Sequence, residues 1–336
     1  MVRIKDIAQV AGVSTTTVSN VIHGNLKKVS PENVKKIQSL LEQMDYIPSM
    51  GARMLAGKAS CMIGVILPLT KERSLRQITD PFLSTILGAI EAEAYEANYY
   101  VIFHQADSSE DMNVLVSKWN VDGLISICMP DAINEKAASL LKIPFVTVDG
   151  YYEKQEIFNV GLDDVGGGYD MAAYLLQQGH KKLYYLADGD TGANYMRWLG
   201  VKRALEERGR ETKGCFLQIP CEWEERRSFY QRRLKLLSEA DALFFASDYY
   251  AMDAILFLEE QGIQVPDKVS VAGFDDSFLA SLCHPALTTV RQDIEKKGRL
   301  AVQLLLGQIR GESCEQREIR LPVELIKRET VRVRES

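Results

Sequence analysis

Small polar side chains gather on one face of a short predicted helix near the start of the chain. These side chains are Thr15, Thr16, Ser19 and Asn20. Each can donate and accept hydrogen bonds, and such groups near the N-terminal end of a helix can read base edges in a DNA major groove. The pattern therefore indicates a recognition helix. The alternative interpretation is a surface helix hairpin without a partner.

A second group of side chains, far along the chain, could hold a small hydroxyl-rich molecule. The planar guanidinium of Arg197 can bind vicinal hydroxyls or a carboxylate through two hydrogen bonds. Asp248 and Asp275 each follow a predicted strand, and the indole of Trp223 can cover the C–H face of a sugar ring. Plainer interpretations are a salt bridge for the arginine, a cap or a turn for the two aspartates, and packing for the tryptophan.

No catalytic or cofactor motif accompanies these groups. The sequence lacks G-x-S-x-G, G-x-x-x-x-G-K-[ST] and H-E-x-x-H. Gly166-Gly167-Gly168 lacks the spacing of a dinucleotide loop, and a glycine-rich helix start packed near the ligand site explains it. Six scattered cysteines and four histidines form no metal-ligand cluster. We therefore expect no enzyme, no metal and no cofactor, and we expect buried, reduced thiols.

Short helices must position the first group of side chains. Apolar residues at helical spacing predict a helix over 4–11, Gly12 predicts a tight turn, and Ser14 can cap the next helix. Ser30-Pro31 predicts the start of a third helix. Residues 50–56 form a further segment that is too short to be a stable helix without a partner.

Beyond residue 60, short apolar strands alternate with amphipathic helices. Strands are predicted at 62–67, 100–104, 123–127, 145–148, 182–186, 242–246 and 269–274. Helices are predicted at 82–97, 113–119, 132–141, 166–178, 195–208, 224–237, 251–261 and 294–306. This alternation is typical of parallel sheets covered on both faces. Two such sheets in series predict two lobes with a ligand cleft between them.

Several runs of residues, in this order, resemble the lactose/galactose-repressor (LacI/GalR) family of bacterial transcription regulators. In the N-terminal part they are Ile4-Lys5-Asp6-Ile7-Ala8, Gly12-Val13-Ser14, Thr17-Val18-Ser19 and Tyr46-Ile47-Pro48. In the body they are Val121-Asp122-Gly123-Leu124-Ile125, Gly179-His180-Lys181-Lys182, Gly273-Phe274-Asp275-Asp276 and Pro285-Ala286-Leu287-Thr288-Thr289-Val290. The resemblance thus covers nearly the whole chain.

The resemblance implies roles on DNA. Thr15, Thr16 and Asn20 occupy base-reading positions, and Asn20 stands where arginine is common, which favours adenine at that base pair. The remaining side chains of this segment are expected to serve capping, packing or phosphate contact; they are Ser14, Thr17 and Ser19.

Residues 50–56 resemble the family's hinge helix, whose Ala52 and Leu55 are expected to contact DNA. Leu55 would insert between base pairs in the minor groove. The alternative for Leu55 is packing between lobes.

The resemblance also implies an effector cleft. It assigns Arg197, Asp275, Trp223 and Asp248 to that cleft. Asp80 and Phe82 resemble the first-lobe wall, although residues 70–79 are longer than the usual connection there, and Gln292 lies at a lobe crossover. The family's fold further implies three crossovers, with the predicted helix at 294–306 returning to the first lobe.

These observations predict an α/β fold with a helix-turn-helix headpiece and a two-lobed body resembling periplasmic binding proteins. The headpiece is expected over 1–48 and the hinge helix and linker over 49–58. The first lobe is expected over 59–160 with 292–321, and the second over 161–291 with 322–336.

Charge is divided unevenly along the chain. Residues 1–58 carry eight Lys or Arg and four Asp or Glu, so they are formally +4, whereas the whole chain is −6 and the remainder is −10. A basic module suits the phosphate backbone of DNA. No signal region or membrane-spanning run is found, so we expect a cytoplasmic protein.

The sequence therefore predicts a transcription regulator, acting as a repressor, whose operator affinity is controlled by a sugar or sugar derivative. An acidic sugar is left open. We expect a homodimer, because one headpiece reads too few base pairs and no leucine-heptad tail follows. The competing hypothesis is a solute-binding protein or carbohydrate enzyme that shares only the body.

Overall fold

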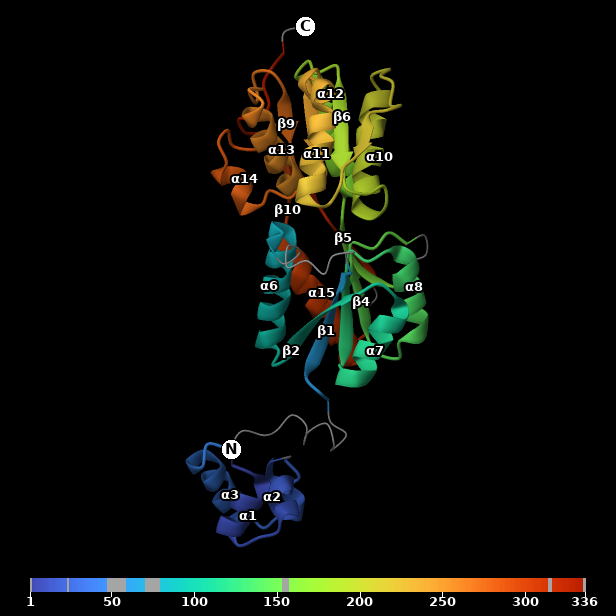
Figure 1. The fold of residues 1–336 in the computed structure, drawn as a ribbon. Coiled ribbons are helices and arrows are strands. Elements are labelled where there is room, and N and C mark those ends of the chain that lie inside the picture. Colours follow the sequence, from blue (N-terminus) through green and yellow to red (C-terminus); the bar gives the residue numbers. More distant parts are fainter. Residues whose placement is uncertain are drawn as a thin grey trace. The chain divides into compact units, whose positions relative to one another are not determined.

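The computed structural model describes residues 2–22, 24–46, 59–69, 79–152, 157–313 and 316–334, and Figure 1 draws its fold. The chain divides into two compact units, Met1–Ser60 and Cys61–Ser336. The predicted hinge helix, with Ala52 and Leu55, lies outside the described residues. Within the described ranges, no helix is long and apolar enough to cross a bilayer.

The first unit contains the predicted helix-turn-helix. Its elements are α1 (Ile4–Ala11), α2 (Thr15–Ile22), the 3-10 helix η1 (Leu26–Lys28) and α3 (Pro31–Gln43). Gly12 ends α1 in the left-handed region at φ 71°, which glycine adopts without strain. The hydroxyl oxygens of Ser14 and Ser30 accept the backbone N–H groups of Thr17 (3.1 Å) and Asn33 (3.4 Å). Both predicted caps are confirmed.

One apolar core joins the three α-helices of this unit. Ile7 on α1, Val18 on α2 and Ile37 on α3 are all fully buried and belong to the same cluster. Burying a side chain of this size contributes about 1.5–3 kcal/mol. The inward face of α2 is therefore fixed, and its opposite face is left to solvent or a ligand.

The first lobe of the second unit is a parallel sheet in the order β11-β5-β4-β3-β1-β2. The strands are β1 (Met62–Pro68), β2 (Tyr100–Ala106), β3 (Gly123–Ile127), β4 (Phe145–Val148), β5 (Phe158–Leu162) and β11 (Glu318–Leu321). One face packs on α6 (Pro81–Glu96) and α15 (Ile294–Ile309), and the other on α7 (Ser109–Trp119) and α8 (Asp131–Leu140). Burial on both faces explains the continuous apolar runs in these strands.

The second lobe is a parallel sheet in the order β7-β6-β8-β9. Its strands are β6 (Leu183–Ala187), β7 (Phe216–Gln218), β8 (Ala242–Phe245) and β9 (Ser270–Ala272). Helices α9 (Asp164–Gln177) and α10 (Gly192–Glu206) pack on one face. The other face carries α11 (Trp223–Arg232), α12 (Leu234–Ser238), α13 (Asp248–Glu260) and α14 (Phe278–Leu282).

The helix predicted as continuous over 224–237 is in fact two helices. Arg233 leaves the helical region at φ −107° and ψ 8°, and it separates α11 from α12. Leu234, Leu236 and Leu237 all lie on α12 and pack on the same core cluster. The prediction of one continuous helix was therefore wrong.

The chain passes between the lobes three times. The passages join β5 to α9, β10 (Thr289–Gln292) to α15, and β11 to β12 (Val323–Ile326). β10 and β12 pair as an antiparallel ribbon. In Figure 1 the red helix α15 lies among the elements of the first lobe although it comes late in the sequence. The expected crossovers and the return of this helix are confirmed.

The prediction of buried thiols was wrong for the described cysteines. Cys128 and Cys221 are exposed, and Cys61, Cys215 and Cys283 are partly exposed, all as free thiols. Cys128 comes directly after β3 and Cys221 lies just before α11, so neither lies in the strand or helix core that its apolar neighbours suggested.

Candidate DNA-reading helix and effector cleft

The polar face of α2 points away from the core of the first unit. Thr15 and Thr16 are exposed, and Asn20 is partly exposed one turn later. The Ser14 and Thr17 hydroxyls lie 2.9 Å apart and engage each other, so they stabilise the helix start. Thr15, Thr16 and Asn20 are therefore accessible from outside the first unit.

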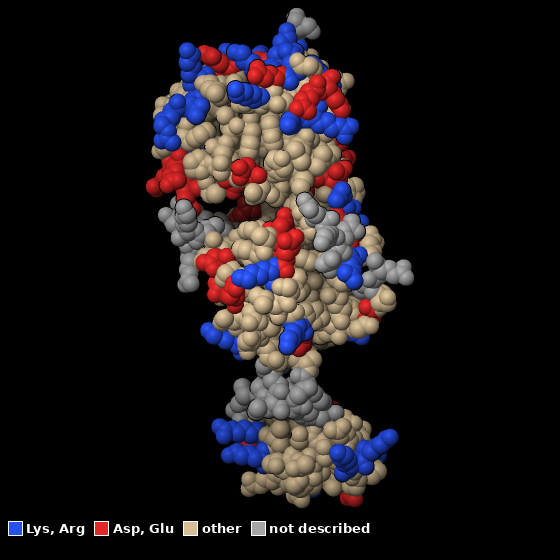
Figure 2. All heavy atoms as spheres, turned by 90° about the vertical axis from the view of Figure 1, so that its right-hand side faces the viewer, with Lys and Arg blue, Asp and Glu red and all other residues tan. Residues whose placement is uncertain are grey.

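Positive charge accompanies this helix. Figure 2 shows several Lys and Arg side chains on the visible face of the first unit, and few acidic ones. Lys36 of α3 donates to the carbonyl oxygen of Ala11 at 2.9 Å, so it stabilises the end of α1. Positive side chains on such a surface suit contact with phosphate groups.

Two helices approach closely to build the second-lobe side of the cleft. A Cβ atom at Gly200 of α10 would overlap the carbonyl oxygen of Val165 on α9, and one at Gly168 would overlap the carbonyl oxygen of Arg197. The backbones of α9 and α10 are thus in direct contact. This close packing explains Gly168, whereas a Cβ at Gly167 would overlap the Phe274 ring and one at Gly166 the Asp163 carboxylate.

Arg197 is buried and already paired at that helix contact. Its Nε lies 2.8 Å from Asp164 Oδ1, and its guanidinium lies 3.6 Å from the centroid of the Phe274 ring. The Tyr151 hydroxyl, which follows β4 of the first lobe, donates to Asp164 Oδ2 at 2.5 Å. Tyr151, Asp164 and Arg197 therefore form a polar chain from the first lobe into the second.

A second polar chain runs through a buried lysine. Lys297 of α15 is fully buried, and its Nζ lies 2.8 and 2.9 Å from the Asp149 carboxylate and 2.7 Å from Gln292 Oε1. Gln292 Nε2 then donates to Asp275 Oδ1 at 2.6 Å. All three N–H groups of the ammonium are satisfied, which a buried charge requires. Lys297 Nζ also lies 5.3 Å from the Phe82 ring centroid.

Sequence reasoning missed Asp149 and Lys297. The usable signal was Lys297 itself, because it falls on the apolar stripe of its helix between Ile294 and Ala301. A lysine on a buried helix face needs a buried partner.

Burial raises the pKa of the Asp275 carboxyl to about 7; Arg197, Gln292 and Lys297 oppose this rise, and Asp80 adds to it. Asp80 caps α6 by accepting the Leu83 N–H at 3.0 Å, and burial together with Asp188 raises its pKa. Asp275 therefore changes its charge near neutral pH. Across the cleft between the lobes, Asp188 thus raises the pKa of Asp80, and Asp80 raises the pKa of Asp275.

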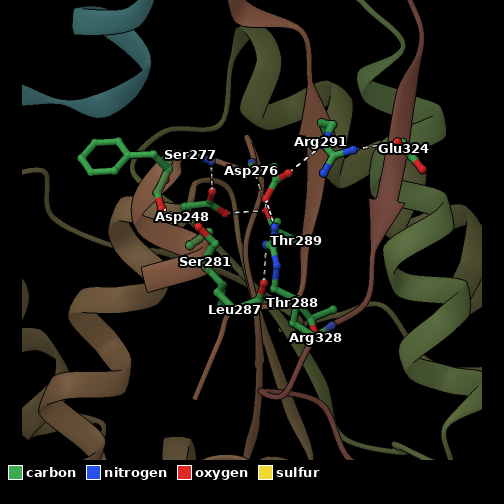
Figure 3. Close-up of polar contacts among 12 residues, drawn as sticks. Asp248, Asp276, Ser277, Ser281, Leu287, Thr288, Thr289, Arg291, Glu324 and Arg328 are labelled. Atoms are coloured by element: carbon green, nitrogen blue, oxygen red, sulfur yellow. Dashed lines mark hydrogen bonds and ion pairs between the residues drawn. The ribbon is translucent and has the colours of Figure 1, made fainter. Parts of the chain in front are cut away.

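Asp248 has two partners within the protein. Its Oδ2 accepts the Ser277 N–H at 2.7 Å and its Oδ1 accepts the Thr289 hydroxyl at 2.5 Å, as Figure 3 shows. Ser247, and not Asp248, caps α13 by accepting the Tyr250 N–H. Asp248 therefore holds the loop that carries Asp275, which the sequence did not suggest.

Trp223 is partly exposed at the start of α11. The guanidinium groups of Arg226 and Arg227 lie 5.9 and 5.3 Å from its ring. No described contact joins Trp223 to Arg197 or Asp275. The structure thus brings Arg197, Asp275, Gln292, Phe82 and Asp80 around the lobe junction, and leaves Trp223 outside their contacts.

Figure 2 shows the body hollowed between its lobes, with acidic side chains inside the hollow. A separate cavity of about 350 Å³ lies beside the crossings and is lined by Tyr151, Asp164 and Met196 among others. None of the seven predicted effector residues lines that cavity. The predicted cleft and this cavity share Asp164 through its ion pair with Arg197.

Comparison with known proteins was made for both units. The model of bacterial regulatory proteins, lacI family, matches residues 3–49, and that of the periplasmic binding protein-like domain matches residues 172–331. The HTH-type transcriptional regulator DegA of Bacillus subtilis (strain 168) is 32% identical over 340 residues, which cover 97% of this chain and 96% of that protein.

Solved structures of similar proteins span the same fold. The lac repressor dimer bound to operator and the anti-inducer ONPF superposes with a TM-score of 0.82 at 25% identity, covering 98% of this chain and 99% of that one. A LacI family transcriptional regulator from Enterococcus faecium with bound ribose has a TM-score of 0.70 at 29% identity, covering 82% of this chain and 100% of that one.

Proposed function

Because this chain belongs to the lacI family of bacterial regulatory proteins, we propose that it is a repressor whose operator affinity is set by a small molecule bound between the two lobes. The observation that carries the proposal is the combination of an exposed polar helix in the first unit with a buried polar network at the lobe junction of the second. Relatives of the chain are transcription regulators, and no enzyme family is indicated.

On the DNA side, Thr15, Thr16 and Asn20 read the major groove, and Asn20 favours adenine. The exposure of Thr15 and Thr16 on α2 supports this assignment. Ala52 and Leu55, from the segment outside the described residues, contact the minor groove, with Leu55 as a wedge.

The effector is a hydroxyl-rich, uncharged molecule of sugar size. In the described residues, the buried cations Arg197 and Lys297 are both already paired with carboxylates, whereas Asp275 Oδ2 accepts no hydrogen bond there. Hydroxyl donors suit this excess of acceptors better than a carboxylate, which disfavours the acidic sugar that the sequence left open. The E. faecium relative with bound ribose supports the sugar class.

The working form is a homodimer whose second-lobe contact involves α13 and α14. Leu256, Phe278 and Leu282 expose 54%, 67% and 71% of their surface on these neighbouring helices. Large apolar side chains that are exposed on neighbouring helices support an interaction surface there. A two-fold dimer also places two headpieces on a pseudo-palindromic operator, and the lac repressor structure is described as a dimer bound to operator.

The test is operator binding with and without sugars. The full chain is used to select fragments from genomic DNA, and binding of the selected fragment is measured by fluorescence anisotropy against a panel of mono- and disaccharides. Asp275→Asn keeps the shape of the side chain and removes its charge. We expect this variant to bind the fragment as the wild type does and to lose at least about tenfold of its sugar response. Selection of no specific fragment by the wild type would support the solute-binding alternative.

A further inference from the structure

The turn that carries Asp275 is strained. Asp275 has φ 118° and Asp276 has φ 54°, so two consecutive residues with side chains lie in the region that favours glycine. Such a conformation is unfavourable for a residue with a side chain and persists only where its surroundings hold it. Something in the second lobe must therefore hold this turn in place.

Two arginines from distant segments hold it. Arg328 Nη2 lies 2.6 Å from Asp276 Oδ1, and Arg291 Nε lies 2.7 Å from Asp276 Oδ2. Both carboxylate oxygens of Asp276 are thus taken, and its side chain is only 7% exposed. Arg328 is itself fixed, because it donates to the Leu287 carbonyl oxygen at 2.9 Å and its backbone N–H donates to the Thr288 hydroxyl at 3.0 Å. Figure 3 shows these contacts converging on Asp276.

The rest of the turn has no freedom to relax. The Asp275 N–H donates to the Val290 carbonyl oxygen at 2.8 Å, and the Ser277 N–H donates to Asp248 at 2.7 Å. The result is that the Asp275 carboxylate reaches Gln292 at the lobe junction. An aspartate in this turn would otherwise be free to point to solvent.

We propose that Asp276 and Arg328 are positioning residues of the effector site, whose ion pair holds the strained turn that presents Asp275 to the ligand. The proposal rests on the proposed function in that Asp275 contacts the effector; Asp276 and Arg328 act only through it. Arg291 extends the clamp, because it also lies 3.2 Å from Glu324 and so ties the turn to the ribbon of β10 and β12. That ribbon leads directly into two of the lobe crossings.

The test measures the pKa of the Asp275 carboxyl in the absence of any ligand. The full chain is labelled with [¹³Cγ]-aspartate, the Asp275 signal is assigned by its loss in Asp275→Asn, and its titration is followed by NMR. The groups that act on this carboxyl are Arg197, Gln292, Lys297, Asp80 and the buried Asp248. In the wild type we expect a midpoint near 7. In Arg328→Met the turn relaxes, Asp275 gains solvent, and the midpoint falls by at least about one pH unit toward its ordinary value.

Arg332→Met is the matched control, because Arg332 is exposed on the same segment, and it should leave the midpoint unchanged. If Arg328→Met does not fold, Arg291→Met is used in its place. It removes the more exposed of the two arginines, so we expect a smaller fall in the Asp275 midpoint. An unchanged Asp275 midpoint in folded Arg328→Met, or in Arg291→Met should Arg328→Met not fold, would overturn the proposal. A normal sugar response in Asp275→Asn would instead overturn the effector assignment, and it would leave the titration result standing.

Discussion

Asp275 and His180 are buried titratable groups of the second lobe whose pKa values move in opposite directions for one reason. Burial disfavours the charged form, so it raises the pKa of the carboxyl and lowers that of the imidazole. For His180 the pKa falls to about 4, with Arg334 adding to the effect of burial and Asp241 opposing it. As the pH falls, the shifted pKa of Asp275 therefore favours the folded state, whereas the shifted pKa of His180 favours the unfolded state.

His180 should make the folded body sensitive to acid. Its folded pKa lies below the ordinary 6.5, so the unfolded chain binds the extra proton first and stability is lost as the pH falls from about 6.5 to about 4. The loss can reach about 3 kcal/mol. His180→Leu cannot be protonated, so its free energy of unfolding should fall less over this range. Urea denaturation at pH 7, 5.5 and 4.5 measures it, and equal pH slopes for both proteins would contradict the prediction.

At the scale of elements, the contact between α9 and α10 decides where Arg197 can lie. Gly168 and Gly200 allow the two backbones to touch, which sets Arg197 beside Asp164 at the N-terminal end of α9. A larger residue at either position would separate the helices and stretch that ion pair. The two glycines therefore help to form the proposed effector site although neither has a side chain that could contact a ligand.

Gly200→Ala should destabilise the body by about 2–3 kcal/mol, because the added Cβ overlaps the Val165 carbonyl oxygen. Gly88→Ala is the matched control: it lies within α6, and its Cβ would meet nothing within 4 Å. That substitution should stabilise the helix by about 0.5–1 kcal/mol. Both are measured by urea denaturation. If Gly200→Ala were as stable as the wild type, the close approach of α9 and α10 would be wrong.

At the scale of the whole molecule, the proposed function includes association with a second copy of the chain. Leu256, Phe278 and Leu282 are far more exposed than apolar side chains of their size usually are. Covering them would remove apolar surface from water and join two bodies, so that two headpieces act on one operator.

Phe278→Glu should prevent this association. A charge in the centre of the apolar surface loses its water on pairing and has no partner there. We expect a monomer by light scattering and at least about a tenfold loss of operator affinity. Trp119→Glu, at another exposed apolar position on α7, serves as the control and should remain a dimer. A dimeric Phe278→Glu protein would remove α14 from the proposed interface.

Much of this architecture could be predicted from local patterns, and the exceptions have physical causes. Helices α6 and α15 have clear apolar faces, and the caps at Ser14 and Ser30 are local chemistry, so the sequence predicted them. Strands β5, β7, β10, β11 and β12 were missed because they are three to five residues long and depend on distant partners. In β11, for example, Glu318 pairs with Asn159.

In the candidate site, too, some residues could be predicted from the sequence and others could not. Arg197 and Asp275 were identified from their chemistry and from family resemblance, and both lie in the buried network at the lobe junction. The pairing of Lys297 with Asp149 joins residues 148 positions apart, and no local pattern predicts such a contact. The clamp of Arg328 on Asp276 spans 52 positions and was missed for the same reason.

The return of α15 and β11 to the first lobe has a consequence for synthesis on the ribosome. The first unit draws its core from its own first four dozen residues, so it can fold as soon as it emerges. The first lobe lacks Val302 and Leu305 in its core until α15 has been translated, and it lacks the edge strand β11 until residue 321 has been translated. During translation the first unit can therefore be folded while the first lobe is still incomplete. Chaperones have their longest opportunity to bind the nascent chain before residue 321 is reached.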